Sequence, residues 1–250
     1  MEVHHHPHTE RKKWTHYFWE FLMLFFAVFC GFLAENQREH IVEHTRELKY
    51  ASSLYEDLKK DTADLTYDIP FWEKLLKKID TIRQEIEKPC SMRNDFLLYR
   101  CSAFMRAYNN FEYHDRTIEQ LKNGGNFRLI RKSVIADSII DYDALIKSEL
   151  RDQEMQSNNI YQTINYLQDK FFNSKYFFSI LREKTLPDSL FNPVSAVFKV
   201  SAFNEPDLFQ YGNHLEYYYT MTSFRLRSNR AVLRKANNLI ELLKKEYNLH

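Results

Sequence analysis

The sequence contains very little glycine, with only four glycines in 250 residues. Phosphate-binding loops and the tight turns of doubly wound sheets depend on glycine, because a residue without Cβ permits close backbone approach and positive φ. The chain also lacks the glycine-rich motifs of nucleotide-binding enzymes. A nucleotide-binding α/β enzyme is therefore not expected.

An excess of charge and clustered cysteines are also missing. Lys and Arg number 35 against 34 for Asp and Glu, so no basic field favours nucleic acid. The three cysteines form no CxxC pair and no zinc-type spacing. Cys30 lies in an apolar run, whereas Cys90 and Cys101 are consistent with either a disulfide or two free thiols. Cysteine usage therefore assigns no compartment.

An uncharged apolar run extends from Phe21 to Ala34 and contains five phenylalanines. This run alone is consistent with a core helix, a signal-peptide hydrophobic region or a membrane span. Extension back to Tyr17 gives about 27 Å of helix, against a hydrocarbon core of about 30 Å. Glu20 lies one turn inside the boundary, where its carboxylate can reach water, and the apolar residues outweigh its cost. We therefore expect a transmembrane helix over 17–34.

The flanks of this run favour an uncleaved anchor. Trp14, Tyr17 and Trp19 form an aromatic belt, and three basic residues stand at 11–13. The end of the run does not supply the small residues that a signal peptidase site needs. Basic residues are denser before the run than after it, which predicts a cytoplasmic N-terminus and a C-terminal domain across the membrane.

The transmembrane helix is expected to continue into a stalk over 35–88, because no glycine or proline occurs between Phe32 and Ile69. Pro70 can kink this helix or start a second one. Mostly apolar residues recur along the stalk in alternating steps of three and four, the heptad-like seam of a helix that packs on a partner. The partner can belong to the same chain or to another copy. The seam residues are Ile41, His44, Leu48, Ala51, Tyr55, Leu58, Thr62, Leu65, Ile69, Trp72, Leu76 and Ile79.

Further helices are expected over 95–122, 127–149 and 151–183, the first ended by the sequence NGGN at 123–126. Three prolines make 184–207 irregular, and SAVFKVSAF within it can form a short strand or an extended loop.

Asn204 can cap a last helix of about 40 residues, because Glu205, Pro206 and Asp207 suit a first helical turn. Its predicted seam is Leu208, Tyr211, Leu215, Tyr218, Thr222, Leu226, Asn229, Leu233, Ala236, Ile240, Leu243 and Tyr247.

These elements predict an all-α protein in which the transmembrane and stalk helix packs with long antiparallel helices as a coiled-coil-like bundle. The expected domains are a His-rich basic tail at 1–16, the transmembrane helix at 17–34, the stalk at 35–88 and a helical domain at 89–250.

Several motifs resemble an uncharacterised family of bacterial single-pass membrane proteins with a helical domain of unknown function. They are VHHHPH, EFLMLFFAVFCGFLAENQREH, SLYEDLKKDT and LKNGGNFRLIRKSVIADSIIDYD. The resemblance covers roughly the first 65 residues and the segment around Gly125. It implies a location in the bacterial inner membrane and supplies no catalytic residue.

Two features of the predicted span are candidate functional residues. His16 and Glu20 are spaced i, i+4 and form a candidate intramembrane ionisable pair, since an ionisable group in a span is a functional candidate. Ala27 and Gly31, with Ala34 near the same side, form a candidate helix-association face, because small residues let two backbones approach closely.

Candidate metal ligands are weaker. His4, His5, His6 and His8 can bind Zn²⁺, Ni²⁺ or Cu²⁺, but a flexible basic tail at the membrane surface is the expected reading. His40 and His44 share a helical face without a visible third ligand, and a solvated stalk face is the expected reading. No cofactor or metal is predicted.

No residue set predicts catalysis. The paired acids Asp57 and Asp61, and Asp141 and Asp143, are expected to be exposed helix residues. Arg128, Arg131 and Lys132 can bind an anion at a helix start, but a solvated face is the expected role.

We therefore expect no enzyme, but a membrane-anchored helical scaffold or sensor that acts through homo-oligomerisation or a protein partner. The expected partners include the lipid bilayer, and neither nucleic acid nor a small-molecule substrate. The alternative is a subunit of an ion-driven or transport assembly in which Glu20 carries a proton.

Overall fold

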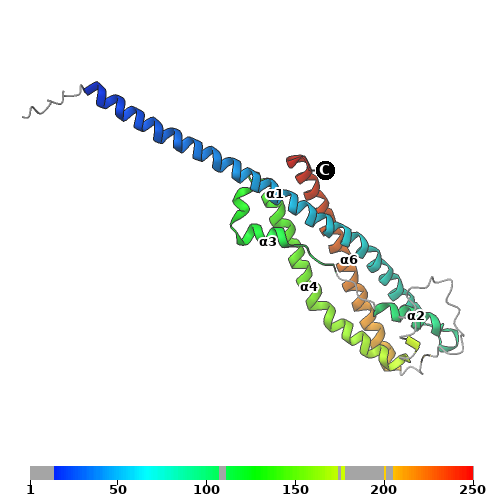
Figure 1. Cartoon of the computed structure of the whole chain (residues 1–250). Coiled ribbons are helices and arrows are strands. Elements are labelled where there is room, and N and C mark those ends of the chain that lie inside the picture. Colours follow the sequence, from blue (N-terminus) through cyan, green and yellow to red (C-terminus); the bar gives the residue numbers. More distant parts are fainter. Residues whose placement is uncertain (1–13, 107–110, 174–175, 178–199, 201–204, 250) are drawn as a thin grey trace, which may run out of the picture. The chain divides into compact units, whose positions relative to one another are not determined.

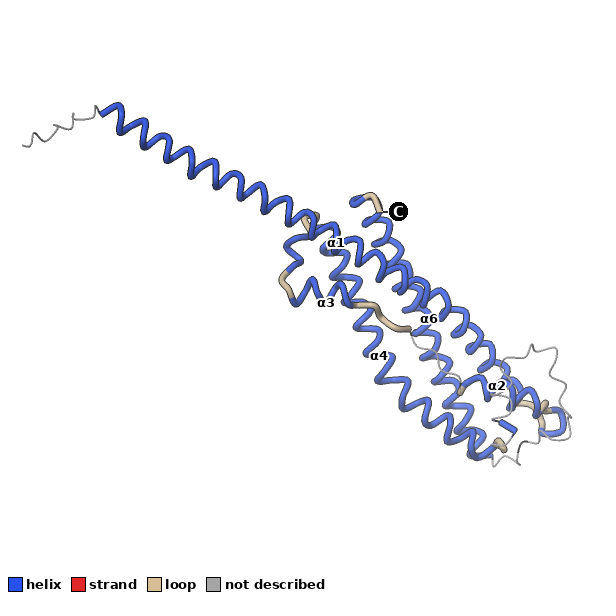
Figure 2. The backbone as a smooth tube through the Cα atoms, viewed as in Figure 1, coloured by secondary structure: helices blue, strands red, loops and turns tan. Residues whose placement is uncertain are grey.

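The computed structural model describes the backbone of residues 14–106, 111–173, 176–177, 200 and 205–249, and side chains in these ranges except at 152–158 and 205. All secondary structure in these residues is helical, which confirms the predicted all-α fold (Figures 1 and 2). The predicted tail, apart from its last residues, and nearly all of the irregular segment lie outside the described residues. The elements are α1 (Trp14–Ile86), η1 (Cys90–Met92), α2 (Asp95–Met105), α3 (Arg116–Asn123), η2 (Asn126–Leu129), α4 (Ser133–Phe171) and α6 (Glu205–Tyr247).

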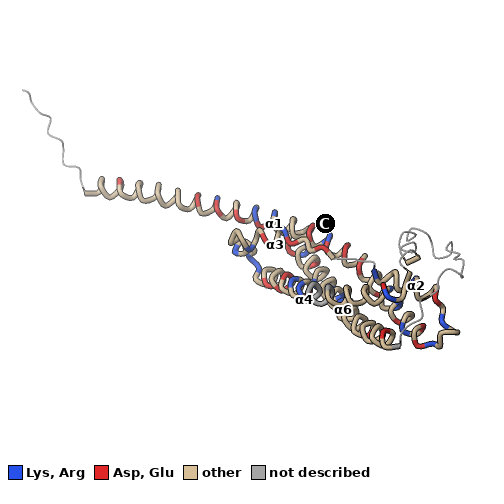
Figure 3. The backbone as a smooth tube through the Cα atoms, turned by 90° about the horizontal axis from the view of Figure 1, so that it is seen from below, with Lys and Arg blue, Asp and Glu red and all other residues tan. Residues whose placement is uncertain are grey.

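The chain divides into two compact units, one up to Tyr50 and one from Ala51 onward. In the first unit, α1 holds an 18-residue window with a mean hydropathy of 1.9, none of which is buried. It is long and apolar enough to cross a membrane. Figure 3 shows this stretch nearly free of charged residues, whereas charges are dense along the rest of α1.

The second unit is a bundle of antiparallel neighbours. Arg83 of α1 pairs with Glu216 of α6 at 2.5 Å. Glu73, which comes earlier in α1, pairs with Arg230, which comes later in α6. The order of these contacts shows that α1 and α6 run in opposite directions (Figure 1). Two more ion pairs give the same relation between α4 and α6, Lys170–Asp207 and Asp141–Lys235, each at 3.0 Å.

The predicted seam of α6 is confirmed, since nine of its twelve residues are buried and the other three are partly buried. From Ala51 onward, the predicted α1 seam is right for one of its two rows and for Tyr55 of the other. Ala51, Leu58, Leu65, Trp72 and Ile79 are buried. The second buried row lies one residue before the predicted one and consists of Leu54, Asp61, Asp68, Leu75 and Ile82. This row was not predicted from apolar spacing, because two of its five residues are acids.

Several predicted helix boundaries are wrong, among them the expected end at Glu183, since α4 ends at Phe171. The expected helix over 95–122 is α2 and α3 with a break between them, and the N–H groups of His114 and Thr117 donate to carboxylates of α1. The expected break between Glu149 and Arg151 is absent, since α4 runs through it without glycine or proline. NGGN ends α3 as predicted, with Gly125 in the left-handed region at φ 61°.

The stalk over 35–88 does not coincide with a compact unit. α1 passes through Pro70 as one helix to Ile86, and its residues after Tyr50 belong to the helical bundle. Only residues 35–50 lie between the apolar stretch and the bundle.

Candidate functional site

A continuous face of α1 before the bundle is exposed along its whole length. Starting from the predicted positions Ile41, His44 and Leu48, the alternation of three and four residues continues back to His16. Such spacing places the residues on one side of a helix. We call this the seam face: His16, Glu20, Met23, Ala27, Cys30, Ala34, Gln37, Ile41, His44 and Leu48, all exposed.

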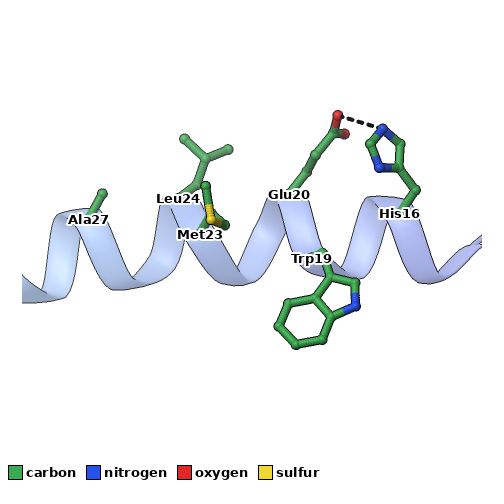
Figure 4. Close-up of a pocket in the computed structure, with 6 residues that line it drawn as sticks. All are labelled: His16, Trp19, Glu20, Met23, Leu24 and Ala27. Atoms are coloured by element: carbon green, nitrogen blue, oxygen red, sulfur yellow. Dashed lines mark ion pairs between the residues drawn. The ribbon is translucent and has the colours of Figure 1, made fainter.

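The seam face contains the predicted ionisable pair. His16 Nε2 lies 3.1 Å from Glu20 Oε1, and each side chain is about half exposed. Figure 4 shows both side chains projecting from the same side of α1 and directed toward each other. The predicted i, i+4 spacing thus gives a direct contact.

A groove beside this pair is lined by His16, Trp19, Glu20, Met23, Leu24 and Ala27 (Figure 4). All of its walls come from one helix, so it is open along its outer side. The predicted small residues continue the same side of α1, and a Cβ added at Gly31 would meet no atom within 4 Å. The surface around Gly31 therefore has room for a second helix backbone.

A second candidate site is a cluster of buried carboxylates, which we call the carboxylate cluster: Asp57, Asp61 and Asp143. They are 2%, 1% and 3% exposed, so the expectation that they are exposed helix residues is wrong, although Asp141 is exposed. Asp61 Oδ1 accepts hydrogen bonds from the backbone N–H of His114 and lies 2.9 Å from its Nδ1. Asp61 Oδ2 accepts a 2.7 Å hydrogen bond from the Tyr142 hydroxyl.

Asp57 and Asp143 bind α3 from two sides. Asp57 Oδ2 accepts from the backbone N–H and the hydroxyl of Thr117, at 3.2 and 2.5 Å. Asp143 accepts from Tyr113 at 2.9 Å and pairs with Lys122 and Lys147. The cluster thus joins α1 and α4 to α3 and to the segment just before it.

The pKa values of Asp61 and Asp143 are shifted in opposite directions. Burial raises the pKa of Asp61, against hydrogen bonds from Tyr142 and His114 that lower it. Burial also acts to raise the pKa of Asp143, but hydrogen bonds from Lys122, Tyr113 and Lys147 outweigh it and lower that pKa. The cationic partners of Asp143 therefore stabilise its charge more fully than the partners of Asp61 do.

Polar contacts at the other end of the bundle are structural. Gln168 donates to the Ser102 carbonyl at 3.2 Å and accepts from Arg106 at 3.0 Å, which ties α2 to α4. Ser102 and Tyr211 hydroxyls lie 3.4 Å apart and add α6 to this network.

Among the described residues, the remaining sequence candidates form no metal site. The histidines at 4–8 lie outside the described residues, and within the described part no group of three or more His, Cys, Asp or Glu side chains is placed to hold a metal. His44 instead lies 3.3 Å from Glu47. Lys132 pairs with Glu246. Cys30, Cys90 and Cys101 are free thiols.

No protein-family model, curated protein or solved structure matches this chain. The resemblance to a bacterial membrane-protein family therefore stays a prediction.

Proposed function

We propose that the protein is a membrane-anchored helical scaffold or sensor that acts by association of α1 with another copy of itself. The observation that carries this proposal is the exposed seam face, which continues from the apolar stretch into the charged part of α1. Ile41 is 59% exposed and Leu48 is 38% exposed, beyond the apolar stretch. Association would remove both side chains from water.

In this proposal α1 crosses the bacterial inner membrane once, over about 17–34. The N-terminus lies in the cytoplasm and the helical bundle lies in the periplasm. The exposed apolar window and the basic residues at 11–13 support this orientation. The carboxylate cluster then joins α3 and α4 to α1, the helix that crosses the membrane.

The association can be tested by Ala27→Phe and Ala34→Phe, measured by fluorescence energy transfer on dilution of the full chain in phospholipid vesicles. Each bulky ring would hold two backbones apart, so we expect dissociation constants higher by about tenfold or more. Val28→Phe is the matched control, because Val28 is 73% exposed but lies off the seam face. Equal effects of all three substitutions, or a monomer at every dilution, would contradict the proposal.

A second candidate is a proton-carrying role for Glu20 in an ion-driven or transport assembly. The 3.1 Å contact with His16 favours it, because an imidazole beside a carboxylate can exchange a proton with it. Glu20→Gln should abolish transport in cells if this role is right. Unchanged transport with Glu20→Gln would remove it.

A further inference from the structure

The seam face extends from the apolar stretch of α1 into its charged part, and a second copy of α1 can cover it along its whole length. Lipid chains can cover Ala27 and Ala34, but Ile41 and Leu48 lie about 10 and 21 Å further along the helix than Ala34. An occupant of the whole face must extend from hydrocarbon into water with the same spacing of side chains. A second α1 that runs in the same direction has this property by construction.

The ionisable residues of the face would meet their own counterparts in a second copy. His16 and Glu20 occupy adjacent layers of the seam, one turn apart. In a parallel pair without a register shift, identical layers meet, so Glu20 faces Glu20 of the other copy, and the two His16 side chains lie one turn away. An antiparallel partner would carry its helical bundle on the opposite side of the membrane, which two identically inserted chains exclude.

We propose that a second copy packs parallel and in register on the seam face, and that His16 and Glu20 of the two copies form one polar layer whose charge regulates the association. This inference rests on the proposed function. It adds the direction, the register and a dependence on pH.

The dependence on pH follows from the charges in the layer. Two Glu20 carboxylates with two neutral imidazoles give a net charge of −2, and protonation of both imidazoles brings it to zero. Like charges repel strongly where water is scarce. The nearest other titratable groups in the sequence are Tyr17 and the basic residues at 11–13, and the basic residues keep their charge over this range of pH. Because histidine ordinarily changes charge between about pH 5 and 8, we expect association to strengthen by about tenfold over that fall in pH.

The register can be tested with a native cysteine. Cys30 is an exposed free thiol on the seam face. In-register pairing brings two copies of Cys30 within the Cα separation of about 4.4–6.8 Å that a disulfide spans. Mild oxidation of the full-length Cys90→Ser protein in vesicles should therefore give a covalent dimer. The control adds Cys30→Ser and Phe32→Cys, which moves the thiol to the far side of α1, and should stay monomeric.

The proton-dependent layer is tested separately by energy transfer between dyes on exposed Cys90 at pH 5.5 and pH 8, in the Cys30→Ser background. The parent should associate about tenfold more tightly at pH 5.5. Glu20→Gln leaves the layer neutral at pH 8 and with two imidazolium charges at pH 5.5, so this variant should associate more weakly at pH 5.5 than at pH 8. An undiminished pH effect in Glu20→Gln would overturn the polar layer.

The outcomes also separate this inference from the proposed function. Energy transfer without a Cys30 disulfide, or with an equal disulfide at Phe32→Cys, overturns the parallel in-register pair and leaves self-association standing. Absence of energy transfer at every pH and dilution overturns both.

Discussion

Asp61 and Asp143 are both buried carboxylates, but they differ in the charge of their partners. Asp143 is held by two lysines and Tyr113, whereas Asp61 accepts mainly from neutral or backbone donors around His114 and Tyr142. A buried charge stabilises a fold only where its partners offset the lost hydration. The two residues should therefore respond differently to removal of their charge.

We expect Asp143→Asn to lower the free energy of unfolding by about 2–4 kcal/mol, because it leaves two lysine ammonium groups beside a neutral amide. Asp61→Asn should change it by less than about 1 kcal/mol or raise it, since an amide can accept from His114 and donate to the Tyr142 oxygen. Urea unfolding of the full chain in mild detergent, followed by helicity, measures both. Equal losses for the two variants would show that the partners' charge is not what separates them.

The same difference gives opposite dependences on pH. Asp143, whose pKa is lowered in the fold, contributes stability that is present above about pH 4 and is lost as pH falls through its folded pKa. Asp61, whose pKa is raised, makes the fold gain stability as pH falls through its folded pKa toward about 4. Unfolding midpoints from pH 7 to pH 3 should therefore fall less steeply in Asp143→Asn than in the parent. A profile of the same steepness in both proteins would refute this assignment.

The carboxylate cluster could not be predicted from sequence for a physical reason. Acidic side chains are rarely buried unless they are paired. Here the partners that make burial possible come from segments far away in the sequence. His114 and Thr117 lie more than 50 residues from Asp61 and Asp57. The contact between His16 and Glu20 was predictable because it lies within one helical turn.

At the scale of single elements, α3 depends on a neighbour. It has eight residues, and its N-cap residue Asp115 makes no side-chain capping bond. Helices this short are marginal alone. Asp57 of α1 supplies the missing acceptor to the Thr117 N–H, and its negative charge suits a helix N-terminus.

Asp57→Ala should therefore loosen α3 without unfolding the bundle. We expect faster amide hydrogen exchange across 116–123 and a stability loss of about 1–3 kcal/mol, because a buried N–H loses its acceptor. Asp57→Asn keeps an acceptor oxygen and should exchange at a rate between the parent and Asp57→Ala. If α3 exchanged no faster in Asp57→Ala than in the parent, capping by Asp57 would be excluded.

The last long helix was predicted better than the short elements. α6 was foreseen with its start, because Asn204, Glu205 and Pro206 mark a helix N-terminus and the seam behind it is long. The break before α3 was missed, because it depends on acceptors from α1 rather than on local turn residues. Neighbouring helices thus decide the short elements.

At the scale of the whole molecule, one helix connects two chemical environments. α1 is exposed and apolar near its start, and from Ala51 onward it forms part of a bundle core. The heptad-like spacing indicated helix packing but could not locate the change from exposed to buried seam residues. Burial locates that change near Tyr50, since the seam face is exposed up to Leu48 and the seam is buried at Ala51.

The most direct test of the account is the accessibility of single cysteines at Thr9 and Ser52 in intact cells and in inverted membrane vesicles, in a Cys30→Ser, Cys90→Ser background. Ser52 is exposed on α1, so a reagent can reach it. The account predicts that a membrane-impermeant thiol reagent labels Ser52→Cys from the periplasmic side and Thr9→Cys from the cytoplasmic side. Labelling of both sites from the same side would contradict a single crossing by α1, and with it the membrane-anchored scaffold.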